Sequence, residues 1–119
     1  MDTSKEYIEM CQKAFEVQNK SIPLCYINYE NVYIDYSGNF WSLEKHQQVW
    51  LPRQDQLQGM VFPDAIYMQK CGLLIHWLEQ QNLSFHKWSA EQLWLAFVMY
   101  EKFNKKWSDG GWVYCWRLD

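Results

Sequence analysis

Residues 89–100 read SAEQLWLAFVMY and contain the longest apolar run of this 119-residue chain. Ser89 is a favourable N-terminal cap, and Gln92 stands three residues later in capping-box spacing. The eight residues that follow Gln92 are apolar on every side of a helical wheel, which is typical of a buried helix. We therefore predict a central helix over residues 89–107. Its expected core positions are Leu93, Phe97 and Tyr100.

An antiparallel sheet is predicted between residues 24 and 50. Ile, Val and Tyr are concentrated in this region, as is typical of strands. Ser37-Gly38-Asn39 is a turn signal within it. The expected strands are residues 24–29, 32–36, 40–43 and 48–50. A last strand at residues 112–116 is expected to rejoin the sheet.

Three further helices are predicted. The first is capped by Thr3 or Ser4 and ends near Asn19. The second occupies residues 51–58, and the third is capped by Pro63-Asp64. The apolar face of the third helix is expected to hold Tyr67, Cys71, Leu74 and Leu78, flanked by Ile75 and Trp77.

No repeat or linker divides the chain, so residues 1–119 are predicted to form a single domain. The helices and strands occur in separate runs, which indicates the α+β class. We expect a small antiparallel sheet packed on one face by three to four helices.

The composition indicates a protein of the cytoplasm. Eleven Lys and Arg stand against 14 Asp and Glu, a net charge of −3, whereas duplex-DNA binders usually carry a basic face. The N-terminus has no secretion signal, and no apolar run approaches the ~20 residues of a membrane span. The cysteines form no C-x-x-C pair and lie beside apolar residues, so reduced and mostly buried thiols are expected. These residues are Cys11, Cys25, Cys71 and Cys115.

No motif for catalysis, for a cofactor or for a metal is present. The three histidines, His46, His76 and His86, lack metal-ligand spacing. The G-x-S-x-G elbow of hydrolases and the glycine-rich phosphate loops are also missing. We therefore predict no catalytic residue, cofactor or metal, while a site assembled across the fold from Asp, Glu and His stays an alternative.

Aromatic residues make up 18% of the chain, an unusually high share, and many fall in the predicted sheet. Tyr33 and Trp41 are expected to be exposed there. Half of the sheet aromatics are expected to pack in the core and the rest to border a protein interface. The alternatives are stacking on single-stranded bases, which needs positive charge nearby, and a small-molecule pocket. Lys45 is the one basic residue close by.

The amide-rich segment WLPRQDQLQ, residues 50–58, is a second candidate surface. A short polar helix usually connects larger elements, and Arg53 and Asp55 would then cap neighbouring helices. The alternative is a recognition edge that presents these two side chains.

Several segments resemble small proteins carried by bacteriophages and prophages. They are residues 6–14 (EYIEMCQKA), residues 50–58, residues 91–99 (EQLWLAFVM), Asn104-Lys105-Lys106-Trp107 and Trp112-Val113. Residues 24–48 fall outside the resemblance, which brings no activity, cofactor or catalytic residue with it. It implies a bacterial cytoplasm and a mobile-element gene.

Together these features predict a non-enzymatic domain that binds another protein or itself. The predicted binding residues are Tyr33, Trp41, Arg53 and Asp55. A single-stranded nucleic-acid binder using the sheet aromatics is the first alternative, and a small enzyme is the second.

Overall fold

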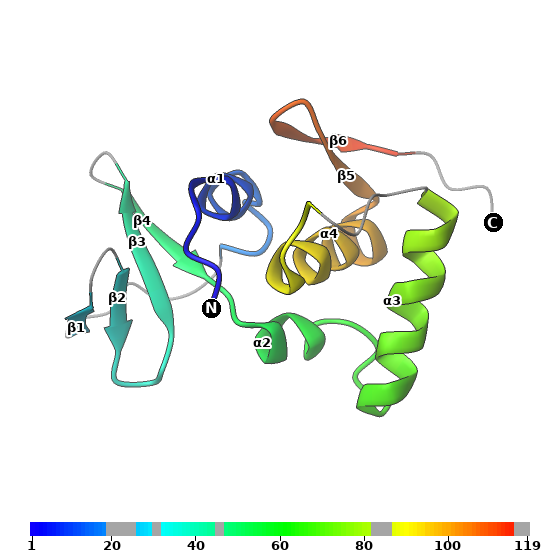
Figure 1. Ribbon diagram of the computed structural model, residues 1–119, viewed down its shortest axis with the longest axis horizontal. Coiled ribbons are helices and arrows are strands. Elements are labelled where there is room, and N and C mark those ends of the chain that lie inside the picture. Colours follow the sequence, from blue (N-terminus) through cyan, green and yellow to red (C-terminus); the bar gives the residue numbers. More distant parts are fainter. Residues whose placement is uncertain (19–25, 30–31, 45–46, 82–86, 116–119) are drawn as a thin grey trace.

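Figure 1 shows the computed structural model, which describes residues 1–18, 26–29, 32–44, 47–81 and 87–115. Helices and antiparallel strands pack into one domain, so the predicted α+β class is confirmed. In chain order the described elements are α1 (Lys5–Lys13), β1 (Tyr26–Tyr29), β2 (Val32–Asp35), β3 (Phe40–Glu44), β4 (Gln47–Leu51), α2 (Gln54–Gln58), α3 (Tyr67–Gln81), α4 (Ala90–Phe103), β5 (Lys105–Ser108) and β6 (Gly111–Tyr114).

The main sheet is an antiparallel meander with the strand order β1-β2-β3-β4. The turn between β2 and β3 occurs where Ser37-Gly38-Asn39 predicts it, and Gly38 adopts φ +82°, a conformation that favours glycine. Tyr33 pairs with Trp41, and Trp41 pairs with Trp50 on the next strand. Because directly opposed residues share a face, these three aromatic side chains form one row across the sheet.

Helix α1 lies between the sheet and α4 (Figure 1). Ser4 caps it, since the Ser4 hydroxyl accepts a hydrogen bond from the Tyr7 backbone N–H at 3.2 Å. The helix ends at Lys13, earlier than the predicted Asn19, because Ala14 leaves the helical region with φ −85° and ψ 70°. The buried Tyr7 hydroxyl donates to the Pro52 carbonyl at 2.6 Å and so joins α1 to the chain that follows β4.

Helix α4 forms the centre of the core. Its predicted capping box is present, with Ser89 and Gln92 bonding each other's backbone N–H groups. Phe97 is fully buried, while Leu93 and Tyr100 are partly buried against the core. The helix ends at Phe103 and does not reach Trp107, because Asn104 adopts a left-handed conformation with φ 55°.

The chain after α4 forms a separate two-stranded hairpin, β5–β6. The prediction that the last strand rejoins the main sheet is therefore wrong. The turn contains Asp109 and Gly110, both with positive φ, which suits a tight hairpin. Trp107 and Trp112 pack edge to face with ring centroids 5.1 Å apart, and the Trp112 indole N–H donates to the Met10 carbonyl of α1.

The remaining helices differ from expectation in their placement. Helix α1 lies against β4, whereas α2 and α3 pack against α4 instead of sharing one face of the sheet. Pro63-Asp64 do not cap α3; they lie in a turn before it, and α3 begins at Tyr67. The Trp77 ring of α3 lies 5.4 Å from the Phe97 ring, which anchors this helix to the core.

Candidate interaction surfaces

The predicted binding residue Trp41 is 4% exposed, so the expectation that it lies on the surface is wrong. Its indole N–H donates to Asp35 Oδ2 at 3.0 Å. Tyr33, its neighbour in the aromatic row, is half-buried against the core. The row therefore contributes to packing and does not present a stack of open rings. Lys45, the cation predicted nearby, lies outside the described residues.

Arg53 and Asp55 form a fork-shaped ion pair at the start of α2. Arg53 Nε and Asp55 Oδ1 are 2.9 Å apart, and Arg53 Nη2 and Asp55 Oδ2 are 3.2 Å apart. The hydrogen bond from Arg53 lowers the pKa of Asp55, and the same bond raises the pKa of Arg53. Arg53 Nη1 also donates to the Gly38 carbonyl, which ties α2 to the β2–β3 turn.

Asp35 organises that turn, although the sequence did not single it out. Its carboxylate accepts bonds from the backbone N–H groups of Ser37 and Asn39, from the Asn39 amide and from Trp41. Burial alone would raise the pKa of Asp35, but these hydrogen bonds outweigh it and lower the pKa. Asp35 lies two residues before Ser37 in Asp-Tyr-Ser-Gly-Asn, and an Asp at the start of a turn is a recognised signal that could have found it.

Three of the four predicted residues, Trp41, Arg53 and Asp55, thus meet at one turn as a structural junction, and Tyr33 lies beside Trp41 on the next strand. Gln56 completes it, since its amide donates to Asn39 Oδ1 at 2.6 Å and its Oε1 accepts from the Arg53 backbone N–H. The interpretation of residues 50–58 as a connecting segment fits this geometry better than a recognition edge.

One face of α3 carries apolar side chains that the described part of the chain leaves uncovered. We define the α3 stripe as Tyr67, Met68, Cys71 and Ile75, which share a face at helical spacing. Tyr67 is 61% exposed, Met68 78% and Ile75 51%, while Cys71 is half-buried. Figure 1 shows α3 at the edge of the molecule, next to α4.

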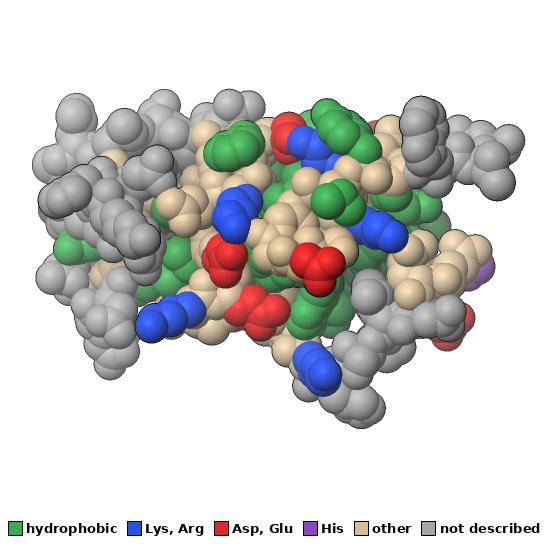
Figure 2. Space-filling model, turned by 90° about the horizontal axis from the view of Figure 1, so that it is seen from above, with side chains coloured by type: hydrophobic (Ala, Val, Ile, Leu, Met, Phe, Trp, Pro, Cys, Tyr) green, Lys and Arg blue, Asp and Glu red, His purple; other side chains and the backbone are tan. Residues whose placement is uncertain are grey.

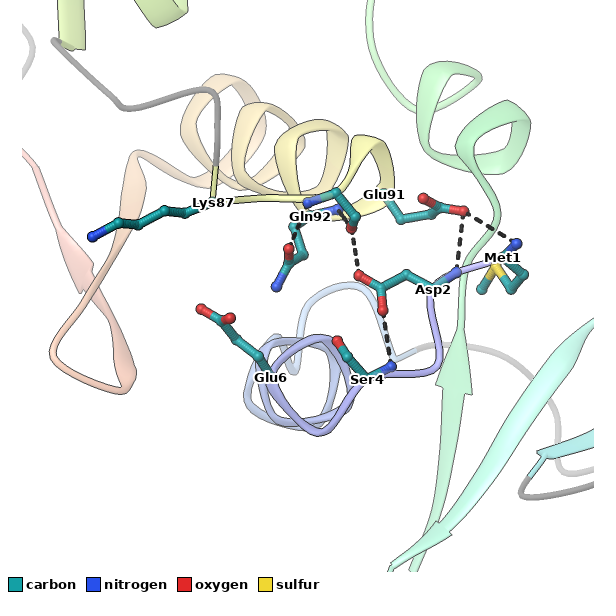
Figure 3. Close-up of a pocket in the computed structure, with 8 residues that line it drawn as sticks. Met1, Asp2, Ser4, Glu6, Lys87, Glu91 and Gln92 are labelled. Atoms are coloured by element: carbon teal, nitrogen blue, oxygen red, sulfur yellow. Dashed lines mark hydrogen bonds and ion pairs between the residues drawn. The ribbon is translucent and has the colours of Figure 1, made fainter.

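A hollow of about 570 Å³ lies where the N-termini of α1 and α4 meet (Figure 3). Asp2 spans it: one carboxylate oxygen accepts from the Ser4 backbone N–H at 2.8 Å, and the other accepts from the Ser89 hydroxyl. Glu91 Oε1 accepts from the Asp2 backbone N–H at 3.2 Å. Asp2 thus bonds the N-cap residues of both helices, and Glu91 holds the backbone of Asp2, so both carboxylates act in helix capping.

The described surface carries no broad field of positive charge on the face seen from above. Figure 2 shows Lys and Arg interspersed there with Asp and Glu. Ion pairs of the described structure include Lys13 with Glu9 at 2.9 Å and Lys105 with Glu16 at 2.6 Å. Mixed charge of this kind offers little attraction to a phosphate backbone.

Groups suited to enzyme chemistry are sparse in the described ranges. His76 is exposed on α3, with a ring nitrogen 3.1 Å from the Gln80 amide, while His46 and His86 lie outside those ranges. No group of three or more His, Cys, Asp or Glu that could hold a metal occurs among the described residues.

The thiols follow the prediction in part. Cys11 is buried, and burial raises its pKa, which disfavours the reactive thiolate. Cys71 and Cys115 are free and half-buried, and Cys25 lies outside the described residues.

Comparisons with protein-family models, curated proteins and solved structures found no match for this chain. Among the described helices, none is long and apolar enough to cross a membrane. The surfaces described above are therefore the basis for a functional proposal.

Proposed function

We propose that this chain is a non-enzymatic interaction domain that binds an apolar surface of a partner protein through the α3 stripe. The observation that carries the proposal is the exposure of Met68, Tyr67 and Ile75 on one face of a single helix. Contiguous exposed apolar side chains are rare on monomeric proteins, and where they occur they commonly mark interaction sites.

The stripe has the composition expected at the centre of an interface. It contains a Tyr, a Met and an Ile and no charged side chain, whereas Lys and Glu are depleted from interface cores. Gly72 lies beside the stripe, and a Cβ added there would meet nothing within 4 Å. A partner helix could therefore approach the α3 backbone closely at this point.

The sheet aromatics give less support to nucleic-acid binding. Trp41 and Trp50 are buried, and Tyr33 is packed against the core, so these rings are not open to bases. Single-strand binders combine exposed rings with a positively charged groove.

A matched pair of variants on α3 tests the proposal. Ile75→Glu places a charge on the stripe, whereas Gln80→Glu places the same charge on an exposed position away from it. The tagged proteins are used for affinity capture from lysate of the source organism, with and without nuclease. In parallel, sedimentation over a wide concentration range measures self-association.

We expect a protein partner, or a second copy, to bind the wild type and Gln80→Glu equally and to bind Ile75→Glu at least tenfold more weakly, because burying an unpaired carboxylate is costly. Binding that survives Ile75→Glu would overturn the assignment of the stripe. Capture that disappears with nuclease, or the absence of any partner and any self-association, would overturn the proposed function.

A further inference from the structure

The outer edge of β4 has backbone groups that point away from β3. In an antiparallel pair, alternate residues direct both N–H and C=O toward the partner strand, and the residues between them direct both outward. Trp50 is an outward residue, because the Gln18 side chain bonds both of its backbone groups. Gln18 Nε2 donates to the Trp50 carbonyl at 2.8 Å, and the Trp50 N–H donates to Gln18 Oε1 at 2.9 Å.

The same period makes Gln48 an outward residue, since it lies two positions before Trp50 on β4 and opposite Leu43 of β3. Its backbone N–H and C=O therefore lie on the edge of the strand that faces away from β3, where no described residue bonds them. Gln18 shows within this chain how a carboxamide binds such an edge. Its amide group bonds both the backbone N–H and the backbone C=O of a single residue, Trp50.

Gln48 also lines a pocket of about 430 Å³. The other lining residues are Gln12, Phe15, Gln18 and Val49. Phe15 is 75% exposed and Gln48 Oε1 is buried with no hydrogen-bond partner in the described structure. A buried acceptor without a donor is costly, and a ligand that donates to it would remove that cost.

We propose that this pocket binds the side-chain carboxamide of a glutamine or asparagine on a partner polypeptide. The ligand oxygen accepts from the Gln48 backbone N–H, and one ligand amide hydrogen is donated to the Gln48 carbonyl. The second amide hydrogen is donated to Gln48 Oε1 once the half-buried Gln48 side chain turns this atom toward the pocket. The Phe15 ring covers the methylene groups of the ligand. The pocket has no charged lining residue, which favours a neutral amide over a carboxylate or an ammonium group.

A side chain fits this edge better than an added β-strand. A new strand along β4 would need the backbone groups of both Gln48 and Trp50, and Gln18 already occupies those of Trp50. A single carboxamide needs only the groups at Gln48. The pocket is formed by α1, the turn after it and β4, so this site is separate from the α3 stripe and does not depend on it.

The test uses three capped amino acids and the full chain labelled with ¹⁵N. N-acetylglutamine N-methylamide is the probe, N-acetylglutamate N-methylamide replaces the carboxamide by a carboxylate, and N-acetylalanine N-methylamide offers secondary backbone amides only. Backbone NMR shifts are followed during each titration. Two or three hydrogen bonds predict a dissociation constant on the order of millimolar, which this measurement reaches.

We expect the glutamine probe to shift the amide signals of Gln48, Val49 and Phe15, and the other two probes to shift them at least fivefold less. Phe15→Ser, at an exposed position, should weaken binding several-fold without changing the rest of the spectrum. Gln48→Leu keeps the backbone groups but removes Oε1, and it should also weaken binding, whereas Gln80→Leu on α3 should not.

Equal shifts with the alanine probe would assign the edge to backbone peptide groups and overturn the side-chain assignment. Equal shifts with the glutamate probe would overturn the selection for a neutral amide. No shifts at Gln48 with any probe, or unchanged binding in both Phe15→Ser and Gln48→Leu, would overturn the site itself.

Discussion

Replacing Asp35 by Asn tests whether one carboxylate holds the junction between the sheet and α2. Asp35 Oδ1 accepts two backbone N–H groups at 2.9 Å, and Oδ2 accepts the Asn39 amide at 3.1 Å and the Trp41 indole at 3.0 Å. An asparagine has the same shape but only one acceptor oxygen. Its NH₂ group must therefore face two of the four donors.

The expected loss follows from that mismatch. Two hydrogen bonds to a charged acceptor disappear, and in the favourable orientation the amide oxygen keeps the two backbone donors. The Trp41 indole N–H, on a side chain that is 4% exposed, is then left without an acceptor. A buried unsatisfied donor costs about 1–3 kcal/mol, and the lost Asn39 bond adds to it, so we expect Asp35→Asn to reduce the free energy of unfolding by about 2–4 kcal/mol at pH 7.

The pH dependence gives an independent check. Because the folded state lowers the pKa of Asp35, its stabilising contribution is present above the usual pKa of ~3.9 and is lost as the pH falls through the lower folded value. The difference between wild type and Asp35→Asn should therefore shrink in acid. The other carboxyl groups are common to both proteins, so their titration largely cancels.

Urea denaturation followed by tryptophan fluorescence, at pH 7 and in acid, measures both quantities. Asp64→Asn is the control, since Asp64 is exposed in the turn before α3 and should change stability by less than ~0.5 kcal/mol. A loss at Asp35→Asn as small as that of the control, or one that stays constant in acid, would refute the role assigned to this carboxylate.

Three further substitutions test other parts of the fold by the same denaturation assay. Phe97→Ala should cost about 3–5 kcal/mol, because its ring is fully buried; a loss under ~1 kcal/mol would mean that α4 is misplaced. Gln18→Ala should cost about 1–3 kcal/mol, since both backbone groups of Trp50 lose its amide, and hydrogen exchange at the Trp50 N–H should accelerate; unchanged exchange would contradict this contact. Ser89→Ala should cost about 0.5–2 kcal/mol through the lost helix cap, and a neutral result would show that the cap is dispensable.

The sequence predicted best those features that depend on neighbouring residues. The capping box of Ser89 and Gln92, the cap at Ser4 and the turn at Gly38 all occur as expected. Each is set by side chains within three or four residues of the backbone groups they bond.

Two predictions at the C-terminal end, the helix end at Trp107 and the return of the last strand to the main sheet, are wrong although local sequence signals indicate the observed structure. Asn104 tolerates the left-handed conformation that ends a helix, and Asp109-Gly110 is a strong hairpin signal. Read together, they predict that α4 stops at Phe103 and that residues 105–108 pair with the strand after the turn. The continuation through Phe103 to Trp107 predicted more helix instead, because period alone does not distinguish a helix from a short strand.

The binding residues were harder to predict because burial depends on tertiary contacts. Alternation along β3 places Trp41 on one face but does not say whether that face is covered. In the same way, the apolar period of α3 grouped Tyr67, Cys71, Leu74 and Leu78, flanked by Ile75 and Trp77. Leu74, Trp77 and Leu78 are buried, whereas Tyr67 and Ile75 are exposed. The period could not show that α4 covers only part of this broad face.

Many of the aromatic side chains contact other parts of the same domain. The cross-strand row of Tyr33, Trp41 and Trp50 packs within the domain, and Trp77 packs against Phe97 on α4. Among the described residues most aromatic side chains are buried or packed against the core, and the exposed ones are Phe15, Tyr36, Phe62, Tyr67 and Tyr114. A better guide to a partner is the disagreement between the predicted apolar face of α3 and its observed exposure. Tyr67, Met68 and Ile75 are apolar enough to be buried, yet they are 51–78% exposed, and no described residue covers this face. That missing cover is the physical argument for a partner at the α3 stripe.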